Sequence, residues 1–87
     1  MDMRKLVGRN FGRLRKEKGF TQEQFAEASG FTQQYVSDLE RGRRNPTVIS
    51  LFHLATALGT EPMELVRSDE LAATEGLTAP AKVPKKR

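Results

Sequence analysis

Residues 21–42, TQEQFAEASGFTQQYVSDLERG, decide the fold, because they contain two short helical patterns separated by a tight turn. Thr21 and Gln24 have the spacing of a capping box, which marks the start of the first helix, and Gly30 marks its end. Thr32 is a favourable N-cap for the second helix. We therefore predict helices over residues 21–30 and over about residues 33–41, the second stopping at Gly42.

The turn between these helices has the residues that a close crossing requires. Gly30 tolerates the left-handed backbone of a tight turn, and Ala26, four positions earlier, is small enough to let the two helices approach each other. Phe25, Val36 and Leu39 occupy the positions of a shared core. Together these residues describe a helix-turn-helix unit, although an unrelated helical bundle would use the same glycine.

Three further helical patterns flank this unit, and no strand pattern or internal repeat is present. Apolar residues recur every three or four positions in residues 3–18, which indicates an amphipathic helix that ends at Gly19. Thr47 caps a fourth helix that Gly59 closes, and Pro62 suits the first turn of a short fifth helix. The apolar stripe of the fourth helix is predicted to consist of Val48, Leu51, Leu54, Ala55 and Leu58.

The composition changes after Arg67. The remainder, SDELAATEGLTAPAKVPKKR, has few large apolar residues and two prolines, and it ends in a basic run. We predict that residues 1–67 form an all-α domain, a compact bundle of five short helices, and that residues 68–87 form a polar, basic and largely disordered tail. Residues 68–73 could extend a helix.

The composition also limits the class of function. A chain of 87 residues holds one domain, and a deep active-site cavity would remove packing that a domain of this size needs. Without cysteine there is no thiolate ligand or nucleophile, and His53 is the only histidine. No apolar run approaches the ~20 residues of a membrane span or forms a signal-peptide core. We expect a cytoplasmic protein without enzymatic activity, cofactor, metal site or membrane association.

Basic side chains are concentrated in two segments, although the net charge is only +4. Residues 4–18 hold seven Lys and Arg against one acidic side chain, and residues 41–44 hold three arginines. Such clusters suit a polyanion, because each basic group near a phosphate releases counterions. The alternative interpretation is a solvated helix face.

With these features the chain resembles the phage repressor and Cro-type helix-turn-helix proteins, also called xenobiotic-response-element-like regulators. The resemblance covers residues 3–67 and lies in TQEQFAEASG, TQQYVSDLERGRRNPT and LFHLATALG. It implies that the helix over about residues 33–41, which is the third helix of the whole chain, enters the major groove of double-stranded DNA. It also implies that Arg15 and Glu40 form a buried salt bridge. We therefore assign these two residues, like Ala26 and Gly30, a structural role. The short tail favours a stand-alone Cro-like regulator or a restriction-modification controller.

The predicted base contacts lie on the outward face of the third helix. Recognition helices of this type address base edges with their N-terminal residues, which here are Gln33 and Gln34. A glutamine amide carries both donor and acceptor groups: its N–H can donate to N7 of adenine, and its carbonyl oxygen can accept from N6. Ser37 and Asp38 follow on the same face, but a carboxylate facing DNA needs cytosine N4 or an arginine as a partner. Ordinary polar surface is the alternative for these residues.

Phosphate contacts are expected from helix ends and from the basic loop. Gln22 resembles the family position that bonds a phosphate at the start of the helix over residues 21–30, where the helix dipole favours an anion. Tyr35 has a hydroxyl to offer, with partial packing on the domain as the competing role. The complete set of predicted phosphate contacts is Gln22, Thr32, Tyr35, Arg41, Arg43 and Arg44, with Arg9 and Arg13 as weaker candidates.

We predict a transcriptional regulator that binds a two-fold symmetric operator as a homodimer, because one domain offers few base contacts and symmetry doubles them. The resemblance places the dimer surface near the fifth helix, with exposed members among Phe52, Met63, Leu65 and Val66. The alternative is an antitoxin or adaptor that binds another protein, with the tail as a possible ligand and DNA binding secondary. A purely structural helical bundle is the third possibility.

Overall fold

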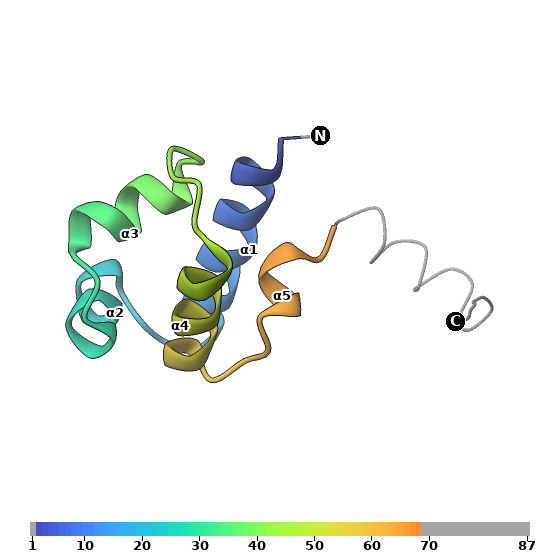
Figure 1. The fold of residues 1–87 in the computed structure, drawn as a ribbon. Coiled ribbons are helices and arrows are strands. Elements are labelled where there is room, and N and C mark those ends of the chain that lie inside the picture. The colour runs from blue at the N-terminus through green and yellow to red at the C-terminus, as the bar shows by residue number, and fades with distance from the viewer. Residues whose placement is uncertain (1, 69–87) are drawn as a thin grey trace.

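The computed structural model describes residues 2–68 as five α-helices with short connections (Figure 1). This arrangement confirms the predicted all-α bundle, and no strand occurs in residues 2–68. The predictions for the tail, a helix over residues 68–73 and disorder beyond, fall almost entirely on residues 69–87, outside the described part. The helices are α1 (Met3–Glu17), α2 (Gln22–Ser29), α3 (Gln33–Glu40), α4 (Val48–Leu58) and α5 (Met63–Val66).

The threonine caps and the predicted turn set the boundaries of α2 and α3. The Thr21 hydroxyl accepts a hydrogen bond from the backbone N–H of Gln24 at 3.0 Å, and the Gln24 side chain accepts from the N–H of Thr21 at 2.9 Å. The Thr32 hydroxyl accepts from the N–H of Tyr35 in the same way. Gly30 has a φ of 86° and donates its N–H to Ala26. The capping box and the left-handed turn residue are therefore confirmed.

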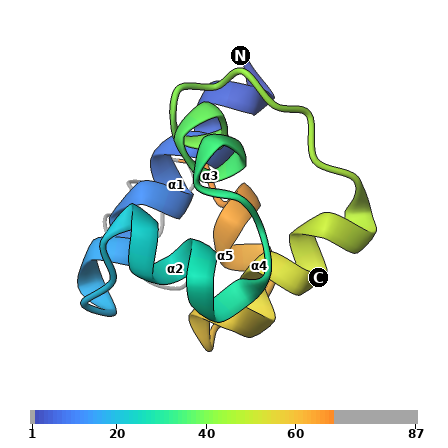
Figure 2. The same cartoon turned by 90° about the vertical axis from the view of Figure 1, so that its left-hand side faces the viewer.

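The core lies where all five helices meet. α1 packs against α3 and α5, and α2 packs against α3 and α4 (Figures 1 and 2). The rings of Phe11 and Phe25 meet edge to face with centroids 4.9 Å apart, and Phe20 meets Phe25 at 5.8 Å. Val36 and Leu39 are fully buried, as the helix-turn-helix pattern requires.

The structure contradicts two sequence-based assignments. Val48 was expected in the apolar stripe of α4, but it is 80% exposed, because it is the first residue of the helix and lies beyond the edge of the core. Leu65 was expected at a dimer surface, but it is fully buried in the core, because α5 packs this residue toward α1 and α4. A second copy of the chain cannot contact Leu65 while the fold is intact.

Candidate nucleic-acid interface

One face of α3 is turned to solvent beside α2, on the side of the molecule that faces the viewer in Figure 2. Gln33 and Gln34 are exposed at the first turn of the helix, and Ser37 and Asp38 are half-buried one turn later. The opposite face carries the buried core residues. The structure thus brings the four predicted base-contacting residues together on one surface, with the two amides at its N-terminal end.

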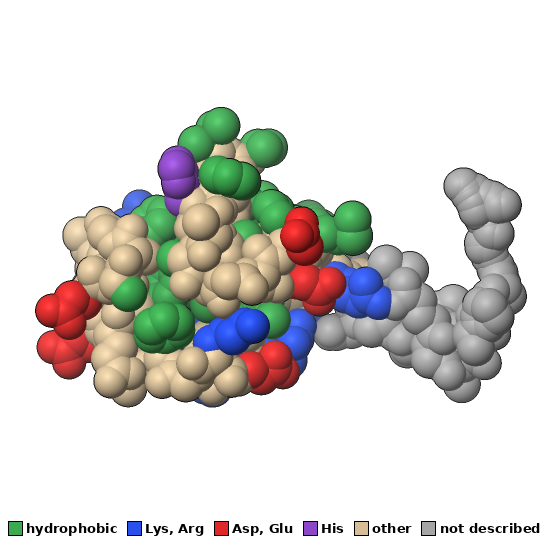
Figure 3. All heavy atoms as spheres, turned by 90° about the horizontal axis from the view of Figure 1, so that it is seen from below, with side chains coloured by type: hydrophobic (Ala, Val, Ile, Leu, Met, Phe, Trp, Pro, Cys, Tyr) green, Lys and Arg blue, Asp and Glu red, His purple; other side chains and the backbone are tan. Residues whose placement is uncertain are grey.

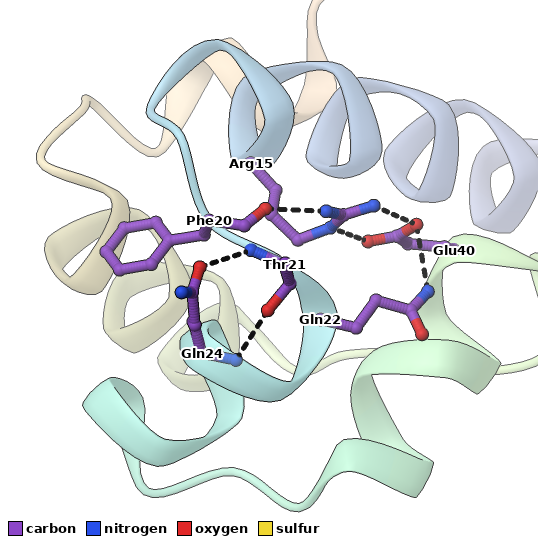
Figure 4. A network of polar contacts seen from close by, with 6 residues as sticks. All are labelled: Arg15, Phe20, Thr21, Gln22, Gln24 and Glu40. Carbon is purple, nitrogen blue, oxygen red and sulfur yellow. Dashed lines mark hydrogen bonds and ion pairs between the residues drawn. The ribbon is translucent and has the colours of Figure 1, made fainter.

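A buried polar network holds the inner side of α3 to α1 and α2 (Figure 4). The guanidinium of Arg15, which is 7% exposed, donates from Nε to Glu40 Oε2 at 2.5 Å and from Nη2 to Glu40 Oε1 at 3.1 Å. Its Nη1 donates to the carbonyl oxygen of Phe20 at 2.7 Å. The salt bridge that the family resemblance implied is therefore present, and it fixes α3 relative to α1.

Gln22 joins the same network. Its Nε2 donates to Glu40 Oε1 at 3.1 Å, whereas its carbonyl oxygen points away from the network (Figure 4). The predicted phosphate contact at Gln22 is thus partly committed to an internal hydrogen bond. One amide N–H remains available at the start of α2, where the backbone N–H groups and the helix dipole favour an anion.

A second polar network lies on the outer side of α3. Asp38 accepts a hydrogen bond from Gln34 Nε2 at 3.0 Å and forms an ion pair with Arg44 Nη2 at 3.5 Å. Arg44 also lies over the ring of Tyr35, 4.9 Å from its centroid, and Tyr35 stacks on Phe31. Asp38 therefore has the arginine partner that a carboxylate on this face requires. The packing role considered for Tyr35 is observed, and its phosphate contact stays a prediction.

The loop after α3 carries the predicted arginine anchors. Arg41 and Arg43 have exposed side chains, while their backbone N–H groups donate to Asp38 O at 3.2 Å and 2.9 Å. Gly42, with a φ of 76°, packs so closely on Lys5 of α1 that a Cβ would lie 2.8 Å from the lysine Cγ. The loop is thus tied to both α3 and α1. Of the weaker candidates in α1, Arg13 pairs with Glu17 at 3.4 Å.

Comparisons with known proteins agree with this geometry. A family model described as helix-turn-helix matches residues 12–65. An uncharacterized HTH-type transcriptional regulator, y4dJ, from Sinorhizobium fredii is 70% identical over 66 residues, which cover 76% of this chain and 86% of that protein. The control protein C.SmaI from Serratia marcescens is 34% identical over 87% of this chain and 90% of its own length. This chain belongs to the helix-turn-helix family of DNA-binding transcriptional regulators.

Solved structures of regulators have the same fold. A hypothetical transcription factor from Neisseria superposes with a TM-score of 0.78 at 30% identity and covers 84% of both chains. The restriction-modification controller protein C.AhdI from Aeromonas hydrophila superposes with a TM-score of 0.68 at 42% identity, covering 71% of this chain and 90% of its own. These relatives are regulators and controllers by name rather than enzymes. The resemblance to the phage repressor and Cro type is therefore confirmed.

Sequence reasoning missed three residues that position the helices: Gly8 and Gly12, where α1 crosses α3, and Asn10, which ties α1 to α5. A Cβ on Gly8 of α1 would overlap the carbonyl oxygen of Leu39, and one on Gly12 would lie 3.3 Å from Glu40 Oε1. α1 therefore crosses the C-terminal end of α3 at van der Waals distance. Asn10, which is 4% exposed, donates from Nδ2 to the carbonyl oxygens of Leu65 and Arg67 at 3.0 Å and 2.8 Å. An asparagine among the inward positions of an amphipathic helix was the available signal.

Exposed apolar side chains of α4 and α5 form a second surface, away from the outer face of α3. Figure 3 shows hydrophobic side chains that protrude at one edge of the molecule. Phe52 is 56% exposed and Met63 is 66% exposed, so the predicted dimer residues other than Leu65 lie at the surface. Sequence reasoning had not included Ile49, one turn before Phe52. We call this set the α4–α5 apolar surface; it consists of Val48, Ile49, Phe52, Met63 and Val66.

Within the described residues, no helix is both long enough and apolar enough to cross a bilayer. The same residues contain no group of three His, Cys, Asp or Glu side chains that could hold a metal ion. His53 is exposed and lies beside Phe52, with the ring centroids 5.7 Å apart.

Proposed function

We propose that this regulator binds double-stranded DNA sequence-specifically, with α3 in the major groove, and that it does so as a homodimer on a two-fold symmetric operator. The observation that carries the proposal is the contrast between the two sides of α3. Its inner side is fixed by the Arg15–Glu40 pair, whereas its outer side presents the amides of Gln33 and Gln34 without any apolar cover. A rigidly held helix with exposed donors and acceptors is suited to reading base edges.

The chemistry of each group suggests its role at the DNA. The amides of Gln33 and Gln34 match adenine, and a bidentate contact of this kind discriminates between bases by ~1–3 kcal/mol. Ser37 can donate to a base or to a phosphate. Phosphate contacts would come from the start of α2, from the cap of α3 and from the loop, through Gln22, Thr32, Tyr35, Arg41, Arg43 and Arg44. Such contacts set register and affinity without reading sequence.

Selection on a random duplex library at ~150 mM salt tests this function. Sequencing of the bound fraction should give a motif of two half-sites related by two-fold symmetry and about one helical turn apart. If the folded protein enriches no sequence, specific DNA reading by α3 is refuted. The alternative then gains support, namely an antitoxin or adaptor whose main ligand is a protein, with the tail as a possible contact.

The α4–α5 apolar surface supports the homodimer. Large apolar side chains gathered on one exposed surface are typical of an interface between protein chains. Their position away from the outer face of α3 would leave both recognition helices free to meet adjacent major grooves. The proposed dimer contacts are Phe52, Met63 and Val66, from the sequence, together with Val48 and Ile49, from the structure.

Sedimentation analysis of matched variants tests the dimer. Phe52→Lys places a charge in the proposed interface and should shift the protein from dimer to monomer at micromolar concentration. Glu27→Lys, at an exposed position of α2, is the control and should leave the dimer intact. Equal sedimentation of both variants and the parent protein would refute this surface as the interface.

The DNA-binding role also implies that the protein works in the compartment that holds the DNA, which we predicted to be the cytoplasm.

A further inference from the structure

We propose that Asp38 is a positioning residue that fixes the hydrogen-bonding polarity of the Gln34 amide and thereby makes the site prefer adenine to guanine. This inference rests on the proposed function, because it concerns the base that Gln34 would meet. Its starting observation is that both oxygens of the Asp38 carboxylate are engaged within the protein. Oδ1 accepts from Gln34 Nε2 at 3.0 Å, and Oδ2 pairs with Arg44 Nη2 at 3.5 Å.

The carboxylate is held firmly enough to act on its neighbour. Its side chain is 19% exposed, and it lies one helical turn after Gln34 on the same face of α3. Arg44, its second partner, is itself restrained because its guanidinium lies over the Tyr35 ring, 4.9 Å from the centroid. Tyr35 in turn stacks on Phe31 at 4.9 Å. The position of the carboxylate is thus set by a chain of contacts that reaches the turn between α2 and α3.

An ionised carboxylate only accepts hydrogen bonds, so it determines which end of the Gln34 amide faces it. The NH₂ group must point toward Asp38, and the carbonyl oxygen must point away. One of the two amide N–H groups is then consumed. What remains for a DNA base is one N–H donor and one carbonyl acceptor, in a fixed orientation.

This remaining pair discriminates between the two purines. Adenine presents N7 as an acceptor and N6 as a donor in the major groove, which complements one donor and one acceptor. Guanine presents two acceptors, N7 and O6. An unrestrained glutamine can donate both of its N–H groups to them, but in this protein one of those groups already faces Asp38. The carbonyl oxygen of Gln34 would instead meet guanine O6, with lone pairs opposed.

Asp38→Asn tests the proposal, because asparagine has the same shape and its side-chain amide can donate as well as accept. The restraint on Gln34 polarity is then lost. For the operator obtained by selection, the ratio of affinities for adenine and guanine at the Gln34 position should fall about fivefold or more in this variant. A ratio within one variant cancels the general increase in DNA affinity that follows from removing a negative charge. Glu27→Gln, which removes a negative charge at an exposed position of α2 outside the predicted DNA contacts, is the control and should keep the ratio at that position.

The same substitution in a Gln34→Ala background separates an effect through the Gln34 amide from effects of Asp38 that do not involve Gln34. There Asp38→Asn should leave the ratio unchanged, since no amide remains to be oriented. Three results would each overturn the proposal. The first is an equal fall of the adenine-to-guanine affinity ratio in both backgrounds, and the second is an unchanged ratio in Asp38→Asn alone. The third is selection of guanine at this position by the parent protein. If the parent protein shows no sequence preference at all, the DNA-reading function itself fails.

A measurement without DNA provides an independent readout. In an NMR spectrum of the free protein, the Gln34 side-chain NH₂ proton that is hydrogen-bonded to the Asp38 carboxylate should resonate downfield of the same proton in the Asp38→Asn variant. The backbone amide shifts of the core should stay in place. Identical Gln34 side-chain resonances in the parent and the variant would overturn the proposal, whatever the DNA measurements show.

Discussion

The most demanding prediction concerns the Arg15–Glu40 pair, and the perturbation is Glu40→Ala. In the intact protein the buried Arg15 guanidinium has three hydrogen-bond contacts, of which two go to Glu40 and one to the carbonyl oxygen of Phe20. The substitution removes the only carboxylate of the network and leaves a positive charge that is 7% exposed. The Nε2 of Gln22 loses its partner as well.

The magnitude follows from the burial of both partners. Removing one member of a buried ion pair costs ~3–5 kcal/mol, because the remaining charge is desolvated without compensation. For a domain of this size, each kcal/mol lowers Tm by about 4–8 °C. Since the total free energy of unfolding of a small domain is about 5–15 kcal/mol, Glu40→Ala should remove a large part of it.

Urea unfolding followed by circular dichroism measures this loss, and the chain offers a matched control. Arg13 and Glu17 form an ion pair at 3.4 Å, but their side chains are 49% and 56% exposed. Glu17→Ala should therefore cost at most ~0.5 kcal/mol. In the double variant Arg15→Met with Glu40→Leu, much of the loss should be recovered, because well-packed apolar groups replace the pair. A cost for Glu40→Ala as small as that for Glu17→Ala would contradict the expected penalty for leaving the buried Arg15 charge unpaired.

Three further outcomes test the packing and the proposed interface. Gly8→Ala should destabilise the protein by ~1–3 kcal/mol in thermal unfolding, because its Cβ would overlap Leu39 O. Lys16→Ala, on the exposed face of the same helix, should change the stability little. A stabilising effect of Gly8→Ala would contradict the close crossing of α1 and α3. Asn10→Ala should cost ~1–3 kcal/mol in the same assay by leaving two carbonyl oxygens without their donor, and no loss would exclude Asn10 as the tie between α1 and α5. Arg43→Ala should weaken specific and random DNA about equally in fluorescence anisotropy and reduce the slope of log affinity against log salt by about one; a selective loss on the operator would assign Arg43 to base reading instead.

Local signals were sufficient to predict the helix-turn-helix unit. The threonine caps, the left-handed Gly30 and the buried Val36 and Leu39 all follow from residues close in sequence, and the structure confirms them. Such features depend on backbone hydrogen bonding and helical periodicity, which the sequence encodes directly. The Arg15–Glu40 pair, by contrast, came from the family resemblance and not from spacing.

Features that depend on how the helices pack were harder to predict. Periodicity assigned Val48 to the core and the family resemblance placed Leu65 at a dimer surface, whereas the docking of α4 and α5 leaves Val48 exposed and Leu65 buried. The close approach at Gly8 needs the position of Leu39 in α3, which lies more than thirty residues later. The outer network around Asp38 depends on the path of the arginine loop, because Arg44 reaches it only when that loop folds back on α3.

The amides at the start of α3 are proposed to read adenine in the major groove. The most direct measurement replaces each selected adenine of the operator, one at a time, with 7-deazaadenine, which keeps the base pair and removes only the N7 acceptor. At the adenine that Gln34 reads, the parent protein should lose affinity by about 2- to 10-fold, as expected for one hydrogen bond, and the Gln34→Ala variant should lose nothing further. Unchanged affinity of the parent protein at every substituted adenine would contradict the claim.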